Sequence, residues 1–107
     1  MLENCKIKPA IVQIECHPYL QNDEIVEFCN KNQIRTFASS PLGDSNFSRN
    51  TLNNLLKEDI LIDISKKYLK LPVQICLRWL YQRGIGSIPK AITDEQIVDY
   101  ASVRIIY

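Results

Sequence analysis

The only histidine of the chain stands beside a cysteine and a glutamate, three residue types that carry out much of enzyme chemistry. They are Glu15, Cys16 and His17, within the stretch QIECHPYL. A histidine beside a thiol can activate it as a nucleophile. These residues, however, end a run that is typical of a β-strand, in which successive side chains point to opposite faces. The three side chains therefore converge poorly, and we expect them to orient the strand end rather than to react.

The cysteines do not suggest a metal site. The chain has four of them, far apart and without a Cys-x-x-Cys pair. A zinc site needs more ligands at closer spacing, and one histidine cannot supply them. We therefore expect no metal and interpret the cysteines as reduced, mostly buried core residues. They are Cys5, Cys16, Cys29 and Cys76.

The composition argues against several classes of partner. The 107 residues carry a net charge of +1 and no basic stripe, which disfavours a nucleic-acid or membrane-surface role. Apolar runs such as Ile60–Ile64 are too short to cross a bilayer. The first ten residues, MLENCKIKPA, contain no continuous apolar segment of the kind that directs secretion. We expect a cytoplasmic protein.

Three short apolar runs predict strands at 10–16 (AIVQIEC), 34–39 (IRTFAS) and 85–89 (IGSIP). Helical patterns lie between and after them, over 22–31, 55–69, 72–83 and from Thr93 onward, and the polar stretch 44–54 predicts a loop. Strands that alternate with helices indicate an α/β fold with a parallel sheet and helical crossovers. Three such strands leave two open sheet edges, which makes a poor free-standing unit.

Local signals predict where two of the helices begin. Asn22 is expected to cap the helix over 22–31. The apolar face of that helix is expected to hold Ile25, Phe28 and Cys29. Thr93 and Gln96 have the spacing of a capping box for the last helix.

Four motifs together resemble one family, the aldo-keto reductases. KPAIVQIECHPYL (Lys8–Leu20) is similar to the family's sixth barrel strand and the turn after it, and SSPLG (Ser39–Gly43) to the end of the seventh strand. PVQICLRWLYQRG (Pro72–Gly84) resembles the seventh helix, and SIPKAIT (Ser87–Thr93) resembles the eighth strand with its cofactor loop. The motifs stand in the family's order and cover roughly residues 7 to 100.

The resemblance implies a partial (β/α)8 TIM barrel. The complete fold has about 250 residues and an active site at the carboxyl ends of its strands. Residues 1–107 match only the last three strand–helix units, as one partial domain. The family's catalytic Asp, Tyr, Lys and His belong to earlier strands, so we expect no catalytic residue here, and His17 is not the family's catalytic histidine.

The resemblance also implies a set of cofactor-binding residues. Gln13 aligns with the glutamine that hydrogen-bonds the nicotinamide carboxamide. Lys90 matches the lysine that meets the 2′-phosphate of NADPH, and Asp99 matches an acidic adenine contact. The other matched positions are Ser39, Ser40, Leu42, Gly43, Thr93 and Gln96.

Each of these positions also has a purely structural interpretation, and both interpretations stay open at this point. Gln13 would then be a satisfied polar group among barrel side chains, and Lys90 a solvated surface lysine. Ser40–Gly43 would form an ordinary strand-ending turn, and Thr93 would simply cap its helix.

Several positions depart from the family's pattern, three of them at positions matched to the cofactor site. Ser39 stands where an aromatic ring usually stacks on the nicotinamide, although Phe37 lies on the same side of the strand and could compensate. Ala91 and Gln96 replace the usual serine and arginine. A neutral glutamine cannot give the bidentate, charge-assisted bonds that arginine gives to a phosphate. We therefore expect a weaker preference for NADPH than is usual in the family.

Two functions remain. The chain could be the C-terminal part of an NAD(P)H-dependent reductase of aldehydes and ketones, contributing the cofactor wall. NADP(H), or NAD(H), and a small carbonyl substrate would then bind only in a complete barrel. Alternatively, it could be a truncated, non-catalytic product that acts as a binding module or self-associates through its open sheet edges. The substrate cannot be derived from this sequence.

Overall fold

The computed structural model describes residues 2–43 and 55–105, with the side chains of 104 and 105 outside that description. The sequence expectation of a loop over 44–54 lies outside the described residues. The elements, in chain order, are η1 (Leu2–Asn4), β1 (Ile11–Glu15), α1 (Asp23–Lys31), β2 (Arg35–Ser39), α3 (Asp59–Tyr68), α4 (Pro72–Gln82), β3 (Gly86–Ser87), α5 (Asp94–Ala101) and η2 (Ser102–Ile105).

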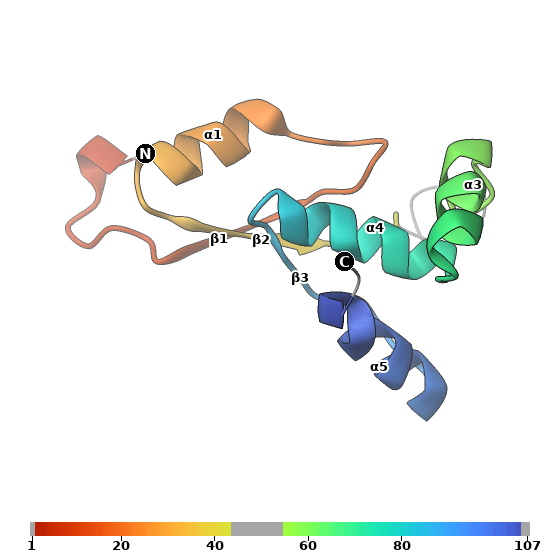
Figure 1. The fold of residues 1–107 in the computed structure, drawn as a ribbon. Coiled ribbons are helices and arrows are strands. Elements are labelled where there is room, and N and C mark those ends of the chain that lie inside the picture. Colours follow the sequence, from red (N-terminus) through yellow and green to blue (C-terminus); the bar gives the residue numbers. More distant parts are fainter. Residues whose placement is uncertain (1, 44–54, 106–107) are drawn as a thin grey trace.

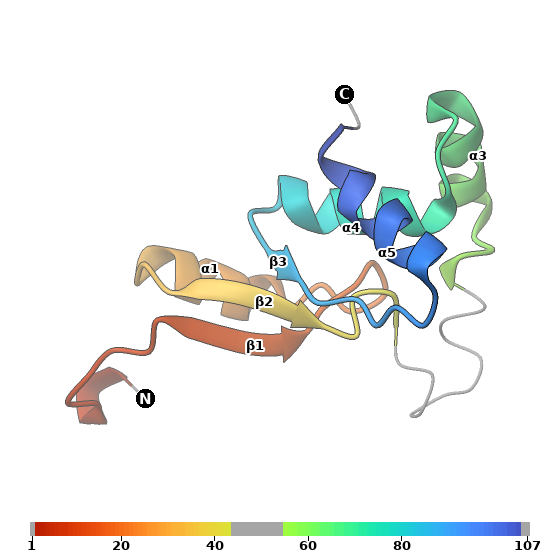
Figure 2. The same cartoon turned by 90° about the horizontal axis from the view of Figure 1, so that it is seen from below.

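The strands form one parallel sheet in the order β1-β2-β3, which confirms the predicted parallel sheet (Figure 2). Gln13 lies opposite Phe37, and Phe37 lies opposite Gly86. The third strand is shorter than predicted. The N–H of Ile85 donates to the carbonyl of Leu80 at the end of α4, and Pro89 has no N–H to donate to a ladder.

The two faces of the sheet differ. Helices α1 and α4 cover one face, and the opposite face of β1 and β2 carries no described helix (Figure 1). Side chains on the covered face, such as Thr36 and Ala38, are buried. Gln13 and its neighbours on β1, Ile11 and Glu15, lie exposed on the open face. The pattern follows from the alternation of strand side chains, with apolar or small residues turned toward the helices.

One expectation for α1 is wrong, and the apolar face of the helix is only partly buried. Asn22 occupies the position before the helix but makes no side-chain cap; its Nδ2 donates instead to the carbonyl of Glu15 at 2.7 Å. Val26 and Cys29 are buried, whereas Ile25 and Phe28 are 43% and 48% exposed. The apolar face of α1 is wider than the surface that the described sheet can cover, so part of it stays in contact with water.

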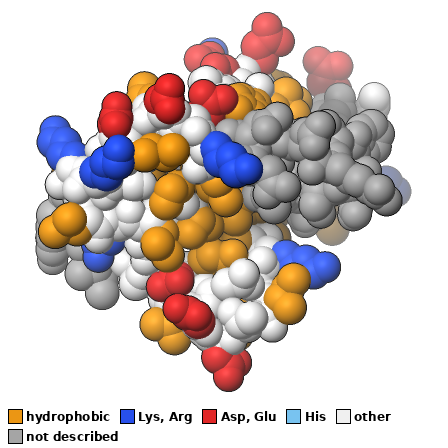
Figure 3. Space-filling view, turned by 90° about the vertical axis from the view of Figure 1, so that its right-hand side faces the viewer, with side chains coloured by type: hydrophobic (Ala, Val, Ile, Leu, Met, Phe, Trp, Pro, Cys, Tyr) orange, Lys and Arg blue, Asp and Glu red, His pale blue; other side chains and the backbone are white. Residues whose placement is uncertain are grey.

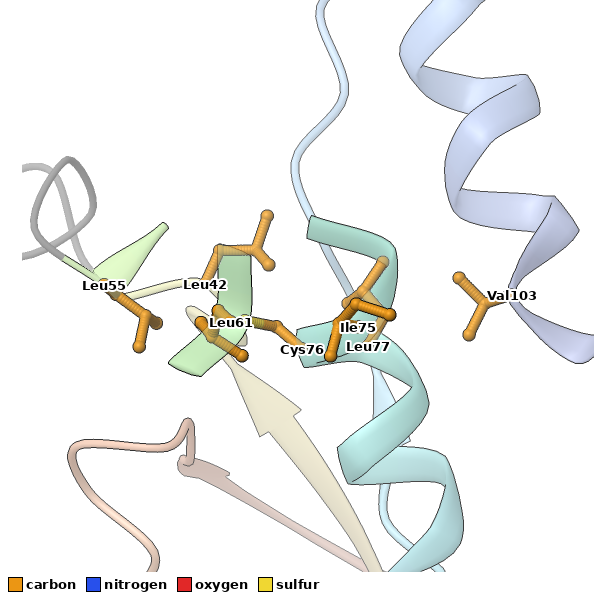
Figure 4. Close-up of a cluster of buried hydrophobic side chains, with 7 residues drawn as sticks. All are labelled: Leu42, Leu55, Leu61, Ile75, Cys76, Leu77 and Val103. Carbon is orange, nitrogen blue, oxygen red and sulfur yellow. The ribbon is translucent and has the colours of Figure 1, made fainter. Parts of the chain in front are cut away.

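An apolar cluster lies beyond the sheet, where α4 meets α3 and η2 (Figure 4). Its buried members are Leu42, Leu55, Leu61, Ile75, Cys76, Leu77 and Val103. They come from the loop after β2, from the segment before α3, from α3 and α4, and from η2. This cluster holds the loop after β2 against the first half of α4.

The buried thiols fit the sequence expectation of core residues. Cys16, Cys29 and Cys76 are buried and reduced, and Cys5 lies exposed. Burial raises the pKa of Cys76 to about 12. No helix in the described part of the chain is both long and apolar enough to cross a membrane.

Candidate functional site at the carboxyl ends of the strands

A cavity of about 670 Å³ opens beyond the carboxyl ends of β2 and β3. Its walls come from the loop after β2, the segment between β3 and α5, the start of α4 and one face of α5. Its lining includes Ser40, Leu42, Gly43, Lys90, Gln96 and Asp99, six of the nine residues that the family resemblance implied. On the side of the molecule where α3 and α5 lie, apolar side chains gather in the centre with charged ones around them (Figure 3).

The loop after β2 forms one wall as a tight turn. The N–H of Gly43 donates to the carbonyl of Ser40 at 2.8 Å. Both residues have left-handed backbones, with φ of 45° at Ser40 and 87° at Gly43. Pro41 and Leu42 between them are buried, so the turn is anchored by its apolar residues. Pro41 has no N–H and the Gly43 N–H is used within the turn, so Ser40 and Leu42 carry the N–H groups of this turn that could meet an anion.

The start of α5 forms the opposite wall, and its predicted capping box is confirmed. Thr93 Oγ1 accepts the N–H of Gln96 at 3.3 Å. Gln96 Oε1 in turn accepts the N–H of Ile92 at 2.8 Å and that of Thr93 at 3.4 Å. The side-chain oxygen of Gln96 is thus occupied by hydrogen bonds from backbone N–H groups. Thr93 caps the helix and is not among the residues that line the cavity.

A buried glutamine, which the sequence analysis did not single out, fixes α5 against α4. Gln74 is 6% exposed. Its Oε1 accepts the N–H of Leu71 at 2.9 Å, and its Nε2 donates to the carbonyl of Asp99 at 3.0 Å and to Ser102 Oγ at 2.8 Å. The sequence does contain one signal for this role, since Gln74 is a polar residue within the otherwise apolar face of its helix. Because Leu71 and Asp99 both line the cavity, Gln74 holds its two helical walls together.

Two charged side chains line this cavity, Lys90 and Asp99. Lys90 is exposed and Asp99 is partly buried. The Lys90 ammonium can meet an anionic group, and the Asp99 carboxylate can accept hydrogen bonds from a neutral one. A single cation in the lining can pair with one anionic group, such as a phosphate. Tyr100 adds an aromatic side chain to the lining that the sequence analysis did not predict.

The remaining predicted residues, Gln13 and Ser39, do not line the cavity. Gln13 is exposed in the middle of β1, and Ser39 ends β2 opposite Glu15. The structure thus separates two groups of predicted residues, one around the cavity and one on the open face of the sheet. Phe37 lies on that open face too, as alternation predicted, but its ring rests against Gly86 on β3.

The turn after β1 is braced by hydrogen bonds within residues 15–22. His17 Nε2–H donates to Glu15 Oε1 at 3.1 Å. The backbones of His17 and Leu20 exchange two hydrogen bonds of 3.1 and 2.8 Å, and the Cys16 thiol donates to the carbonyl of Gln21 at 3.4 Å. These contacts fit the expectation that Glu15, Cys16 and His17 orient the strand end. Within the described residues, no group of three or more His, Cys, Asp or Glu could hold a metal ion.

Arg83 clamps the same turn from the end of α4. Its guanidinium donates to the carbonyl of Gln21 at 3.3 Å, pairs with Asp23 and stacks 4.5 Å from the ring of Trp79. Burial raises the pKa of Cys16, and the nearby Arg83 charge opposes part of that rise. A buried thiol with a raised pKa is a poor nucleophile, which further disfavours thiol chemistry at this turn.

A second link joins this turn to the segment before α3. The Tyr19 hydroxyl donates to the carboxylate of Glu58, at the residue that precedes α3. This hydrogen bond raises the pKa of Tyr19. The turn after β1 is therefore tied to α3 by Tyr19 and to α4 by Arg83.

Comparison with known proteins identifies relatives of this chain. The family model described as "Aldo/keto reductase family" matches residues 1–104. Aldo-keto reductase family 1 member A1 of Bos taurus is 35% identical over 105 residues, covering 96% of this chain and 32% of that protein. The NADP-dependent D-sorbitol-6-phosphate dehydrogenase of Malus domestica is 43% identical over 88 residues, covering 80% of this chain and 28% of that protein.

The solved structures agree with the sequence relatives. A crystal structure of an aldo-keto reductase complexed with NADPH superposes with a TM-score of 0.84 at 39% identity, over 95% of this chain and 32% of that one. The expected fold, a partial (β/α)8 barrel, is confirmed by this likeness and by the open parallel sheet. The chain spans about a third of the length of the proteins it matches.

Proposed function

The chain belongs to the aldo/keto reductase family, and from that premise we propose that it supplies the cofactor-binding wall of a cytosolic NAD(P)H-dependent carbonyl reductase. The complete enzyme would reduce small aldehydes or ketones to alcohols. The bound cofactor would supply the hydride, and a cofactor site built by the protein would position it. Residues 1–107 form one partial domain of that barrel in this proposal.

One observation carries the proposal. Six of the residues that the family resemblance implied come from separate parts of the chain, and they line a single cavity at the carboxyl ends of the strands. This is the end of a (β/α)8 barrel at which ligands bind. The volume of about 670 Å³ falls within the range of small-molecule sites.

Within the cavity, each residue has a distinct task. The Lys90 ammonium would pair with the 2′-phosphate of the adenosine half. Asp99 would accept hydrogen bonds from the adenine amino group. The N–H groups of Ser40 and Leu42 would meet the pyrophosphate.

On the open face of the sheet, Gln13 would hold the nicotinamide end. Its side-chain amide can donate and accept at once, which fixes the orientation of a carboxamide. Ser39 gives this end no aromatic surface, and the ring of Phe37 is engaged with Gly86 on the neighbouring strand. We therefore propose that nicotinamide is held less tightly here than in family members with an aromatic residue at that position.

The alternative function, a non-catalytic binding module, rests on the unpaired edges of β1 and β3 in the described sheet. Exposed sheet edges invite pairing with another strand. The two functions differ in what the cavity binds, so ligand binding to the cavity discriminates between them.

The test uses the 107-residue chain and adenosine 2′,5′-bisphosphate, because the adenosine side of the site lies within the described residues while the nicotinamide side is open. Calorimetry should show binding that Lys90→Met weakens about ten-fold, the value of one charge-assisted contact. Lys66→Met, at an exposed lysine of α3, is the matched control and should leave binding unchanged. Adenosine 5′-monophosphate, which lacks the 2′-phosphate, should respond to neither variant.

An equal effect of the two lysine variants, or no binding by the wild-type chain, would remove the support for the cofactor role. The same preparation should show no NADPH-linked reduction of an aldehyde panel, because the family's catalytic residues have no match in residues 1–107. Turnover above background that Gln13→Ala abolishes would contradict this expectation and would place a working site in the chain itself.

A further inference from the structure

Among the described residues, Asp99 is the only acidic one that lines the candidate cofactor cavity. Two side chains hold it through its backbone carbonyl, which accepts from Gln74 Nε2 at 3.0 Å and from Ser102 Oγ at 2.8 Å. In the described part of the chain no donor bonds to the Asp99 carboxylate. The position of the residue is therefore fixed, while both carboxylate oxygens stay free to accept hydrogen bonds from a ligand.

Gln96 cannot complement Asp99 in full. Of the described residues that line the cavity, Gln96 alone carries a side-chain amide. Its Oε1 accepts the N–H groups of Ile92 and Thr93 and is held at the start of α5, whereas Asp99 lies almost one helical turn later. The amide oxygen of Gln96 is therefore not free for a base, and the task of accepting from a base falls to the Asp99 carboxylate.

The two purine bases offer different groups to such a carboxylate, which can only accept hydrogen bonds. Adenine has one donor on this edge, its 6-amino group, and a ring-nitrogen acceptor beside it. A side-chain amide, which donates and accepts at once, is the group that matches adenine. Guanine has two adjacent donors, N1–H and the 2-amino group, which a carboxylate can accept together in a bidentate, charge-assisted pair. The free carboxylate of Asp99 therefore matches guanine better than adenine.

The other groups of the cavity do not distinguish one purine from another. Tyr100 lines the cavity and packs against the apolar cluster of α3, α4 and η2. Stacking on an aromatic ring tolerates every base, because every base has a π-face. The Lys90 ammonium can pair with a phosphate, which is the same in both nucleotides. The choice of base therefore depends on Asp99.

We propose that the candidate cofactor cavity binds guanine nucleotides, with Asp99 accepting hydrogen bonds from N1–H and the 2-amino group of the base. Lys90 pairs with the phosphate. A guanine nucleotide then competes with the cofactor for this cavity. The inference rests on the proposed function, since it uses the same cavity and the same phosphate contact, and it adds a preference among bases.

The test measures by calorimetry how the 107-residue chain binds the 2′,5′-bisphosphates of guanosine, inosine and adenosine. The three ligands carry the same phosphates and differ only in the base. The guanosine ligand should bind most tightly. Inosine keeps N1–H but lacks the 2-amino group, so its ligand should bind about ten-fold more weakly, the value of one charge-assisted hydrogen bond. Lys90→Met should weaken the binding of all three ligands alike.

Asp99→Asn should invert the preference for the base. The variant leaves the backbone carbonyl of residue 99 in place and exchanges one acceptor of the side chain for a donor. The amide can accept from the 6-amino group of adenine and donate to its ring nitrogen. Binding of the guanosine ligand should weaken about ten-fold, and the adenosine ligand should bind at least as tightly as before. Asp63→Asn, at an exposed carboxylate of α3, is the matched control and should change neither affinity.

An inverted preference cannot arise from a loss of folding, which would weaken all three ligands together. If Asp99→Asn does not fold, the comparison of guanosine with inosine on the wild-type chain decides the result. Adenosine binding equal to or tighter than guanosine binding would overturn the inference, as would equal binding of guanosine and inosine or an unchanged preference in folded Asp99→Asn. Adenosine binding that depends on Lys90, without a preference for guanosine, would overturn this inference alone. No binding of any of the three would overturn the proposed cofactor role together with it.

Discussion

The ring of Phe37 lies so close to Gly86 that a Cβ atom added to the glycine would stand 2.7 Å from Phe37 Cε1. The two residues are register partners on β2 and β3. The aromatic ring therefore occupies the space that a side chain at position 86 would take, on the open face of the sheet. This contact explains a glycine inside a strand, where its flexibility is normally a cost.

The effect of Gly86→Ala on the free energy of unfolding should change sign with the residue at position 37. In the wild-type chain it should lower the free energy of unfolding by about 1–3 kcal/mol, because the methyl group and the ring overlap. In the Phe37→Ala background it should raise that free energy by up to about 1 kcal/mol, because alanine restricts the unfolded chain. Urea unfolding of the four proteins measures the coupling. Equal effects of Gly86→Ala in both backgrounds would contradict the contact.

Gln74→Met should lower the free energy of unfolding by about 1–3 kcal/mol. The variant keeps the size of the side chain but leaves the Leu71 N–H without its partner and removes the hydrogen bond to the Asp99 carbonyl, which then keeps only Ser102 Oγ as a side-chain donor. Gln82→Met, at an exposed glutamine of the same helix, is the control and should change stability by less than about 0.5 kcal/mol. Because Gln74 joins the two helical walls of the cofactor cavity, the first variant should also weaken adenosine 2′,5′-bisphosphate binding. A loss of stability with intact binding would show that Gln74 does not hold the cavity together.

Gln96→Arg should tighten NADPH binding more than NADH binding. The guanidinium would add a charge-assisted contact to the 2′-phosphate, worth roughly 1.5–3 kcal/mol, or about ten-fold or more in affinity. The structure adds a cost, since Gln96 Oε1 would no longer accept the N–H groups of Ile92 and Thr93. The midpoint temperature of thermal unfolding should therefore fall as the selectivity for NADPH over NADH rises. Calorimetry with both cofactors, on the reconstituted barrel, checks the selectivity, and equal effects on the two cofactors would refute the role assigned to this loop.

Cys76→Ala should reduce the amount by which the free energy of unfolding falls at alkaline pH. The pKa of Cys76 is raised to about 12 in the folded protein, from an ordinary value of 9.0. Between these values the folded state keeps a proton that the unfolded chain has lost. The free energy of unfolding is therefore intact below about pH 9 and falls above it by up to roughly 1.4 kcal/mol per pH unit.

The measurement is urea unfolding at about pH 8 and about pH 11, which bracket most of that window. Cys76→Ala should be less stable than the wild type at the lower pH because it leaves a cavity, and should lose less stability between the two values. Cys5→Ala, at an exposed thiol, should keep the wild-type dependence. An unchanged pH dependence in Cys76→Ala would show that this thiol does not titrate with folding.

Sequence reasoning identified the first two strands and the cap of α5 because both depend on local patterns. The β-branched runs predicted β1 and β2 to within one residue at each end. The spacing of Thr93 and Gln96 predicted their reciprocal hydrogen bonds. The placement of Phe37 on the side of β2 shared with Ser39 followed from alternation alone.

The remaining features depend on contacts between distant segments. Asn22 had the residue type of a helix cap, but the carbonyl of Glu15 lies within its reach and takes its amide. Ile25 and Phe28 followed the apolar period of α1, yet their exposure is set by how much sheet lies beneath the helix. Gln74 bonds residues 25 and 28 positions away, which no local period encodes.

The left-handed backbone of Ser40 limits which substitutions this position can accept. A φ of 45° is accessible to glycine and asparagine at little cost, and β-branched residues are nearly excluded from it. Exchanges at position 40 should therefore be limited to glycine, asparagine, aspartate and serine, even where the hydroxyl itself binds nothing. A library that randomises position 40 and is sorted only for folded protein should recover this narrow set, whereas exposed positions of α3 such as Lys67 should accept almost any residue.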